Sequence, residues 1–306
     1  MSNRVTGFIF ENHLAHGAFV EISSGVGEML EPRHYSPDVR RLLGEAIAAM
    51  PLLATHQRFE GRINLQFQGD GGKGLRSARR GDIEAPPHMS LLVAQIDHQL
   101  KIRAMAKAPT DLSGSFKDLL FGGLLALMLE PDPDSSRQPT QALVMIEGER
   151  LSDALEGYFN QSEQLPTLIR LVAEGDQLAG FILQRLPLEH TQATQEDWEH
   201  LQMLASTLAE GELLGTEPAT ILRRLFGEEP IRLFDPRPVH VACRCNQASI
   251  ESMLLSLGVD EVQTIVAEQG KVEITCEFCG RQYLFQPTEV QALFTAAGAR
   301  PTQTRH

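Results

Sequence analysis

The sequence predicts an α+β protein of three parts: an N-terminal mixed α/β domain with β-sheets (1–187), a helical linker (188–238) and a small C-terminal α+β domain (239–306). Apolar periodicity switches between strand and helix spacing up to about residue 187 and is helical from there to about residue 232. Two prolines within three residues, Pro236 and Pro238, mark a connection. All four cysteines of the 306-residue chain lie within 37 residues near its C-terminus.

The N-terminal part alternates helix and strand patterns along the chain. Residues 37–54 carry apolar side chains at helical spacing, whereas 61–68 alternate apolar and polar residues as a half-buried strand does. Further elements are predicted as a glycine-rich turn at 69–74, strands at 89–97 and 141–148, a helix within 149–166, and a hairpin over 167–187 that turns at 174–176.

The segment 188–238 is predicted to form short helices with an acidic surface. Thr194 and Asp197 match a capping box, followed by a stripe that begins at Trp198, and Pro218 marks the start of a second helix. Residues 182–231 hold nine acidic and three basic residues. Because short helices depend on tertiary packing more than on intrinsic propensity, the linker is expected to be metastable. The stretch 234–240, with its two prolines, is expected to be a linker.

Composition and charge restrict the class of function. The formal charge is −13, and acidic residues outnumber basic ones 40 to 27, so binding to nucleic acid is disfavoured. The chain has no apolar run of eighteen residues, and the first residues lack the apolar core of a secretory signal. We therefore expect a cytoplasmic protein that neither spans a membrane nor binds nucleic acid.

Cys243, Cys245, Cys276 and Cys279 form the pattern C-x-C-x30-C-x-x-C, which predicts a zinc site. A tetrahedral zinc ion takes four thiolates from two short clips of chain. Gly280, directly after the second clip, suits the positive φ of a tight knuckle. Helices at 247–257 and 260–268, strands at 272–275 and 282–285, and a last helix from about 288 complete a zinc-binding domain. His240 is expected to be a surface residue, because four thiolates already saturate the ion.

The spacing alone fits a purely structural zinc ion as well as a regulatory one. Metal binding can contribute about 10–16 kcal/mol to folding a unit with so small a core. Thiolates held by zinc are also the form that peroxide or hypochlorous acid oxidises, and each cysteine has a possible partner one or two residues away. Oxidation would then give Cys243–Cys245 and Cys276–Cys279 disulfides and release the ion. Permanent structural disulfides fit a cytosolic chain poorly.

Three motifs resemble the thirty-three-kilodalton redox-regulated heat-shock chaperone family, a family of bacterial holdases also called chaperonins. They are the cysteine pattern with its flanking sequence, the segment GYFNQSEQLPTLIRL (157–171), and LLGEAIAAMPLLATHQRFEGRINLQFQGDGG (42–72). Together with a similar domain order, they extend over nearly the whole chain.

The resemblance implies an ATP-independent chaperone of heat shock and oxidative stress rather than an enzyme. Cys243, Cys245, Cys276 and Cys279 would bind one Zn²⁺ in the reduced, inactive form, and oxidation would form the two local disulfides and expel the ion. The linker, at about 188–232, would unfold and uncover a surface for unfolding client proteins. The oxidised form would be a homodimer that passes its clients to the seventy-kilodalton heat-shock chaperone system after reduction. The sequence itself does not give the client-binding surface.

Two other functions fit parts of the sequence. A constitutive zinc-ribbon module with a structural zinc ion could bind a nucleic acid or a protein partner, although the negative charge argues against nucleic acid. A thiol–disulfide oxidoreductase could use Cys276 and Cys279, but no thioredoxin-like βαβ pattern precedes them.

Overall fold

The structure is a computed structural model that describes residues 3–12, 14–55, 60–69, 87–120, 123–132, 135, 137–146, 148–187, 194–227 and 229–298. The chain divides into two compact units, Met1–Ala242 and Cys243–His306, called here the first and the second unit. The predicted boundaries after residues 187 and 238 stay a prediction.

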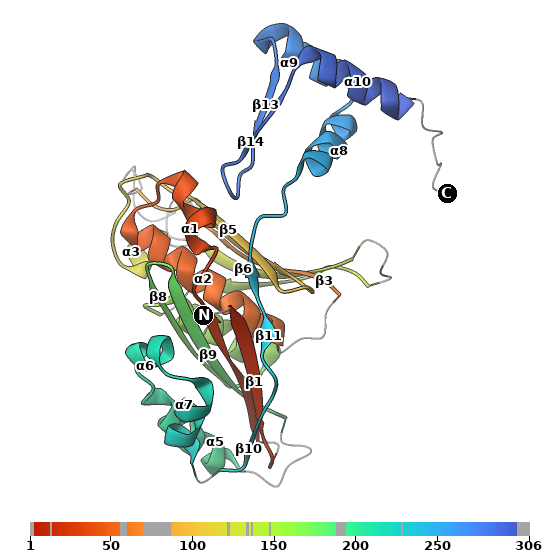
Figure 1. Cartoon of the computed structure of the whole chain (residues 1–306). Coiled ribbons are helices and arrows are strands. Elements are labelled where there is room, and N and C mark those ends of the chain that lie inside the picture. The colour runs from red at the N-terminus through yellow and green to blue at the C-terminus, as the bar shows by residue number, and fades with distance from the viewer. Residues whose placement is uncertain are drawn as a thin grey trace. The chain divides into compact units, whose positions relative to one another are not determined.

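An antiparallel sheet, sheet A, forms one half of the first unit (Figure 1). Its strands run in the order β10-β1-β2-β9-β8, and β11 also pairs with β1. Their bounds are β1 (Arg4–Phe10), β2 (Ala15–Ile22), β8 (Thr167–Glu174), β9 (Gln177–Arg185), β10 (Ile231–Leu233) and β11 (Arg237–Pro238).

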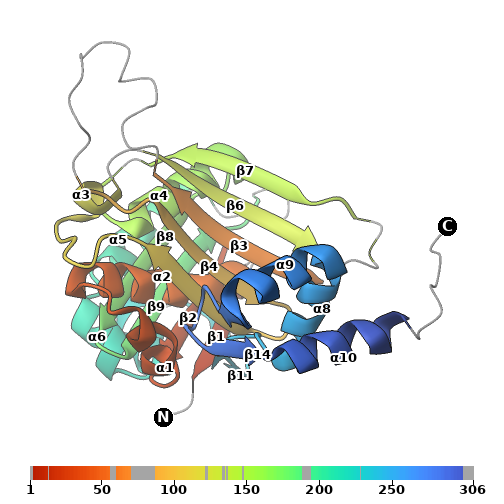
Figure 2. The ribbon, with the colours of Figure 1, turned by 90° about the horizontal axis from the view of Figure 1, so that it is seen from above.

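The second sheet of this unit, sheet B, has the order β12-β5-β4-β3-β6-β7, and β7 lies at its edge (Figure 2). Pairing is antiparallel except between β12 and β5. The bounds are β3 (Gly61–Gln68), β4 (Leu91–Asp97), β5 (Lys101–Lys107), β6 (Leu124–Pro131), β7 (Thr140–Met145) and β12 (His240–Val241).

The helix α2 (Pro37–Thr55) contacts strands of both sheets. Most of its side chains are buried, including the small residues Ala46, Ala48 and Ala49, which allow close approach of the strands. At Gly44 an added Cβ would lie 2.7 Å from Ala173. The amphipathic helix predicted here is therefore buried almost all round. Shorter elements complete the unit: α1 (Val26–Leu30), α3 (Phe116–Leu120), and α4 (Leu151–Tyr158) with a π-helical turn at Phe159–Glu163.

Three short helices follow β9 and lie along sheet A on the side away from α2 (Figure 1). They are α5 (Gln195–Ser206), α6 (Glu210–Gly215) and α7 (Pro218–Phe226). The predicted capping box is present, because Asp197 N donates to Thr194 Oγ1 (3.2 Å) and Thr194 N donates to Asp197 Oδ2 (2.7 Å). Pro218 takes the first turn of α7, as its missing N–H favours.

The second unit contains every element that the sequence predicts for it. It is built from α8 (Gln247–Leu257), α9 (Val259–Gln269), β13 (Val272–Thr275), β14 (Gln282–Phe285) and α10 (Pro287–Gly298). Its small core consists of Ile250, Leu254, Val262, Val272, Tyr283, Phe285 and Val290. Two of the four cysteines, Cys245 and Cys276, pack against that core.

The stretch 234–240, predicted as a linker, contributes a short bridge to each of the two sheets. Arg237–Pro238 pairs with β1 as β11, and His240–Val241 pairs with β5 as β12. These bridges use backbone groups, while most side chains here stay exposed, so no apolar alternation marks them. The predicted turn beyond Gly69 lies outside the described residues. Within the described residues, no helix combines the length and the apolar character needed to cross a bilayer.

Candidate metal centre

The hairpin β13–β14 positions the second cysteine clip. Cys276 follows β13 directly, and its N–H donates to the Arg281 carbonyl (2.9 Å). The Gly280 N–H donates back to the Cys276 carbonyl (2.9 Å), which closes a tight turn around Cys279. Gly280 has φ 68°, a left-handed conformation that glycine adopts without strain. The predicted knuckle is present.

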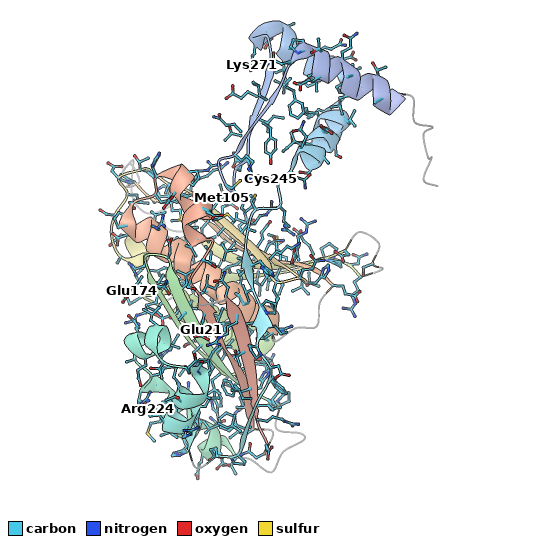
Figure 3. All side chains as sticks on the ribbon, in the orientation of Figure 1. Glu21, Met105, Glu174, Arg224, Cys245 and Lys271 are labelled. Atoms are coloured by element: carbon cyan, nitrogen blue, oxygen red, sulfur yellow. The ribbon has the colours of Figure 1, made fainter. Side chains whose placement is uncertain are left out.

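The first clip lies at the start of the second unit, just before α8. Asn246 is the N-cap of this helix, because its Oδ1 accepts the Ser249 N–H at 2.9 Å. Cys245 therefore directly precedes the N-cap of α8, which fixes the backbone next to it (Cys245 is labelled in Figure 3). Cys243 stands two residues after β12, whose bridge to β5 extends through the Ala242 N–H to the Ile102 carbonyl (2.9 Å).

The four sulfur atoms meet at one point. All lie within 4.8 Å of one another, with Cys243 Sγ 3.6 Å from Cys276 Sγ and Cys245 Sγ 3.4 Å from Cys279 Sγ. In a tetrahedral site with zinc–sulfur bonds of about 2.3 Å, neighbouring sulfurs stand about 3.8 Å apart. The arrangement therefore fits one zinc ion bound by all four residues predicted from the spacing. His240, on β12 of the first unit, is not in this cluster.

The electrostatic environment differs among the four thiols. Burial raises the pKa of Cys243, Cys245 and Cys279. Burial also acts on Cys276, but backbone N–H groups of Cys279 and Phe278 donate to its sulfur and its pKa falls to about 7. Such N–H···S contacts stabilise a thiolate, which is the form that binds metal and reacts with oxidants.

A second feature, the face of sheet A under α5–α7, was not predicted from the sequence. We call it the covered face. It is strongly aromatic, and Gly17 allows the Phe8 ring to lie across β2, since an added Cβ would stand 2.3 Å from that ring. Its buried residues are Phe8, Phe10, Leu14, Ala15, Phe19, Leu168, Val172, Ala179, Phe181 and Leu183. The alternation of Phe8 and Phe10 in the first strand, and of Phe181 and Leu183 in β9, is a sequence signal for it.

The three helices bury their apolar stripes against the covered face. Trp198 is 2% exposed, and the Phe226 ring meets Phe10 edge to face with centroids 5.2 Å apart. The helix side of this cluster consists of Trp198, Leu201, Ala205, Leu208, Leu213, Ile221, Leu222, Leu225 and Phe226. The stripes predicted from the sequence therefore serve to cover a sheet.

Comparison with known proteins identifies similar chains over the full length. The sequence model of the family described as Hsp33 protein matches residues 3–286. A 33 kDa chaperonin of Nitrosococcus oceani is 36% identical over 310 residues, covering all of both chains. One of Methylobacillus flagellatus is 33% identical, covering all of this chain and 99% of the relative.

Among solved structures, the chaperonin of Thermotoga maritima described as heat shock protein 33 homolog has the same fold. Its crystal structure aligns with a TM-score of 0.76 and covers 97% of this chain and 99% of that one. The sequence identity is 19%, so this likeness concerns the fold alone.

Proposed function

The chain belongs to the Hsp33 protein family, and from that premise we propose that it is a redox-regulated, ATP-independent holdase that binds unfolding proteins once oxidised. The observation that carries the proposal is the coexistence of a four-sulfur cluster and a large apolar sheet face covered by short helices.

In the reduced protein, Cys243, Cys245, Cys276 and Cys279 would hold one Zn²⁺. The sulfur–sulfur distances of 3.4 and 3.6 Å support this. Bound zinc contributes about 10–16 kcal/mol to folding in small domains, which is large for a unit whose described residues form a core of seven buried side chains. Loss of the ion would therefore destabilise the second unit.

Oxidation would remove the ligands. Two molecules of hydrogen peroxide and four protons convert four thiolates into two disulfides and four waters, and each step passes through a sulfenic acid that a neighbouring thiol attacks. In a tetrahedral cluster all sulfurs are near one another, so distance does not select the pairs. Cys243–Cys245 and Cys276–Cys279 are favoured because these partners stay one or two residues apart when the clips separate.

The linker helices would then leave sheet A. The chain connects the cysteine cluster to these helices directly, because, among the described residues, only β10, β11 and β12 lie between α7 and Cys243 in the sequence. These three strands are hydrogen-bonded to β1 and β5. Helices of six to twelve residues have little stability of their own. Their departure would uncover the covered face, whose aromatic side chains suit exposed apolar segments of unfolding proteins.

The remaining features of the proposal follow the family. The protein would act in the cytoplasm without enzymatic activity, nucleic acid or membrane binding, form a homodimer when oxidised, and release clients to the seventy-kilodalton heat-shock chaperone system. Homologues carry the name chaperonin, which is consistent with client binding.

A peroxide titration tests the proposal. Zinc release, followed with a chromogenic chelator, should coincide with a red shift of Trp198 emission and with suppression of aggregation of a heated client protein. Trp198 is the chain's one tryptophan, so its emission reports on α5 alone. If zinc leaves while Trp198 stays buried and aggregation proceeds, the ion is structural, as in a constitutive zinc-ribbon module.

A further inference from the structure

At the start of each of the three helices on sheet A, a side chain contacts an arginine from another part of the first unit. Arg185 Nη1 donates to Gln195 Oε1 at the first residue of α5. Arg150 Nη1 lies 3.1 Å from Glu210 Oε1 at the first residue of α6. Arg4 Nη2 lies 2.7 Å from Glu217 Oε2 at the N-cap of α7.

These arginines stand at the margin of the covered face. Every second residue of a strand lies on the same face of its sheet. In β1, Arg4 therefore lies on the same face as Phe8 and Phe10, and in β9, Arg185 lies on the same face as Phe181 and Leu183. Arg150 is the N-cap of α4, which packs against the edge strand β8. The face therefore combines an aromatic centre with guanidinium groups at its border.

The segment that now occupies this face has the complementary character. Residues 194–227 contain six acidic and two basic residues around their apolar stripes. Arg4 also binds Glu21 on β2 through Nε (2.6 Å), a contact that does not depend on the helices (Glu21 and, on α7, Arg224 are labelled in Figure 3). When α5 and α6 leave, Arg185 loses its hydrogen bond to Gln195 and Arg150 loses its ion pair with Glu210, although Arg150 still interacts electrostatically with Glu45 on α2.

We propose that Arg4, Arg150 and Arg185 are specificity-determining residues of the covered face, which select client segments that carry carboxylates beside an apolar stripe. The inference rests on the proposed function. Burial of aromatic and aliphatic groups supplies the non-directional part of binding, and the guanidinium groups add a preference for carboxylates, which they bind in a defined geometry. Clients with basic flanks would meet like charges at the same border.

The size of the preference follows from the exposure of these groups. Arg150 and Glu210 are both more than half exposed, so each such ion pair is weak and screened by salt. We expect each arginine to change affinity by up to about fivefold at low ionic strength. The preference should be nearly lost at about 1 M salt, where the Debye length is about 3 Å.

The test uses the oxidised, zinc-released full-length protein and three fluorescent amphipathic peptides. The peptides share one apolar stripe and differ only in having Glu, Gln or Lys at the polar positions. Dissociation constants are measured by anisotropy at low and high salt for the unaltered chain, for Arg150→Gln/Arg185→Gln, and for Arg137→Gln. Arg137 is an exposed arginine before β7, at the edge of sheet B, and controls for the loss of one positive charge away from the covered face.

The Glu peptide should bind tightest and the Lys peptide weakest, with the order lost at high salt, the differences reduced in the double variant, which keeps Arg4, and unchanged in Arg137→Gln. Equal affinities at low salt, or a preference for Lys, would overturn the inference, as would failure to bind any peptide by protein that still prevents client aggregation. Protein that neither binds peptides nor prevents aggregation would instead contradict the proposed function. Because α5–α7 are already released in this form, any loosening of the reduced variants does not affect the comparison.

Discussion

Replacing Phe226 by alanine should open the covered face without oxidation. Phe226 is 2% exposed in α7 and meets the Phe10 ring at an interplanar angle of 76°. Truncating a buried phenylalanine costs about 3–5 kcal/mol, from lost burial and the cavity left behind. Since about 1.4 kcal/mol is a factor of ten, the equilibrium between covered and uncovered sheet shifts by roughly 10²- to 4 × 10³-fold. Short helices at the margin of a unit open more readily than its central strands.

The measurement is the emission of Trp198 in the reduced, zinc-loaded variant. Trp198 belongs to the same apolar cluster as Phe226, although it lies on α5. We expect its emission to shift to the red, an apolar dye to bind, and client aggregation to be suppressed without oxidant. Met203→Ala is the matched control, since Met203 is also on α5 but is 60% exposed and should leave the emission unchanged.

An unchanged emission spectrum in reduced Phe226→Ala would refute the reasoning. It would mean that packing against the covered face is not what keeps α5–α7 in place. If the variant binds the dye but does not suppress aggregation, packing does hold α5–α7 in place, but the covered face is not the client-binding site.

Three further predictions concern the candidate metal centre, the helix α8 next to it, and the first unit. Cys276→Ser should bring zinc content well below one ion per chain and abolish a separate thermal transition of the second unit, as seen by metal analysis and circular dichroism. Asn246→Ala should lower the stability of α8 by about 1 kcal/mol, because the cap to the Ser249 N–H is lost, and the exposed Gln247→Ala should have little effect. Burial lowers the pKa of His16, so on acidification the imidazole is protonated in the unfolded chain at a higher pH than in the folded one. The free energy of unfolding should therefore fall as the pH drops below about 6.5. His16→Gln should reduce this pH dependence of the free energy of unfolding, measured by denaturant titrations at pH 5.5 and 7.5.

The second unit could be predicted from sequence because its signals are local. Asn246 caps α8, and Gly258 and Gly270, both with positive φ, separate the helices and the hairpin. The first unit was harder for a physical reason. Sheet A is covered on one face by α2 and on the other by α5–α7, so β2 buries nearly every residue and does not alternate. In β5 the buried side chains include Ala104 and Ala106, which are too small and weakly apolar to produce a clear alternation of apolar and polar residues in the sequence.

The cluster of four cysteines could be predicted from spacing alone, whereas the covered face could not. Four cysteines in two clips define a site through their chemistry, whatever the fold. The covered face depends instead on strand register, which brings Phe19 on β2 opposite Phe181 on β9. The contact of Arg4 with Glu217 joins residues 213 positions apart, and no local sequence pattern predicts such a pair.

The helices α5–α7 are anchored in sheet A at both ends, by β9 before them and β10 after them. If they leave while those strands keep their places, they form a tethered loop of about 45 residues between Arg185 and Ile231 rather than a free tail. A tether of this kind keeps its segment at an effective concentration on the order of millimolar, and closure entropy grows slowly with loop length. Closing would then be unimolecular, independent of protein concentration, and in direct competition with any bound client.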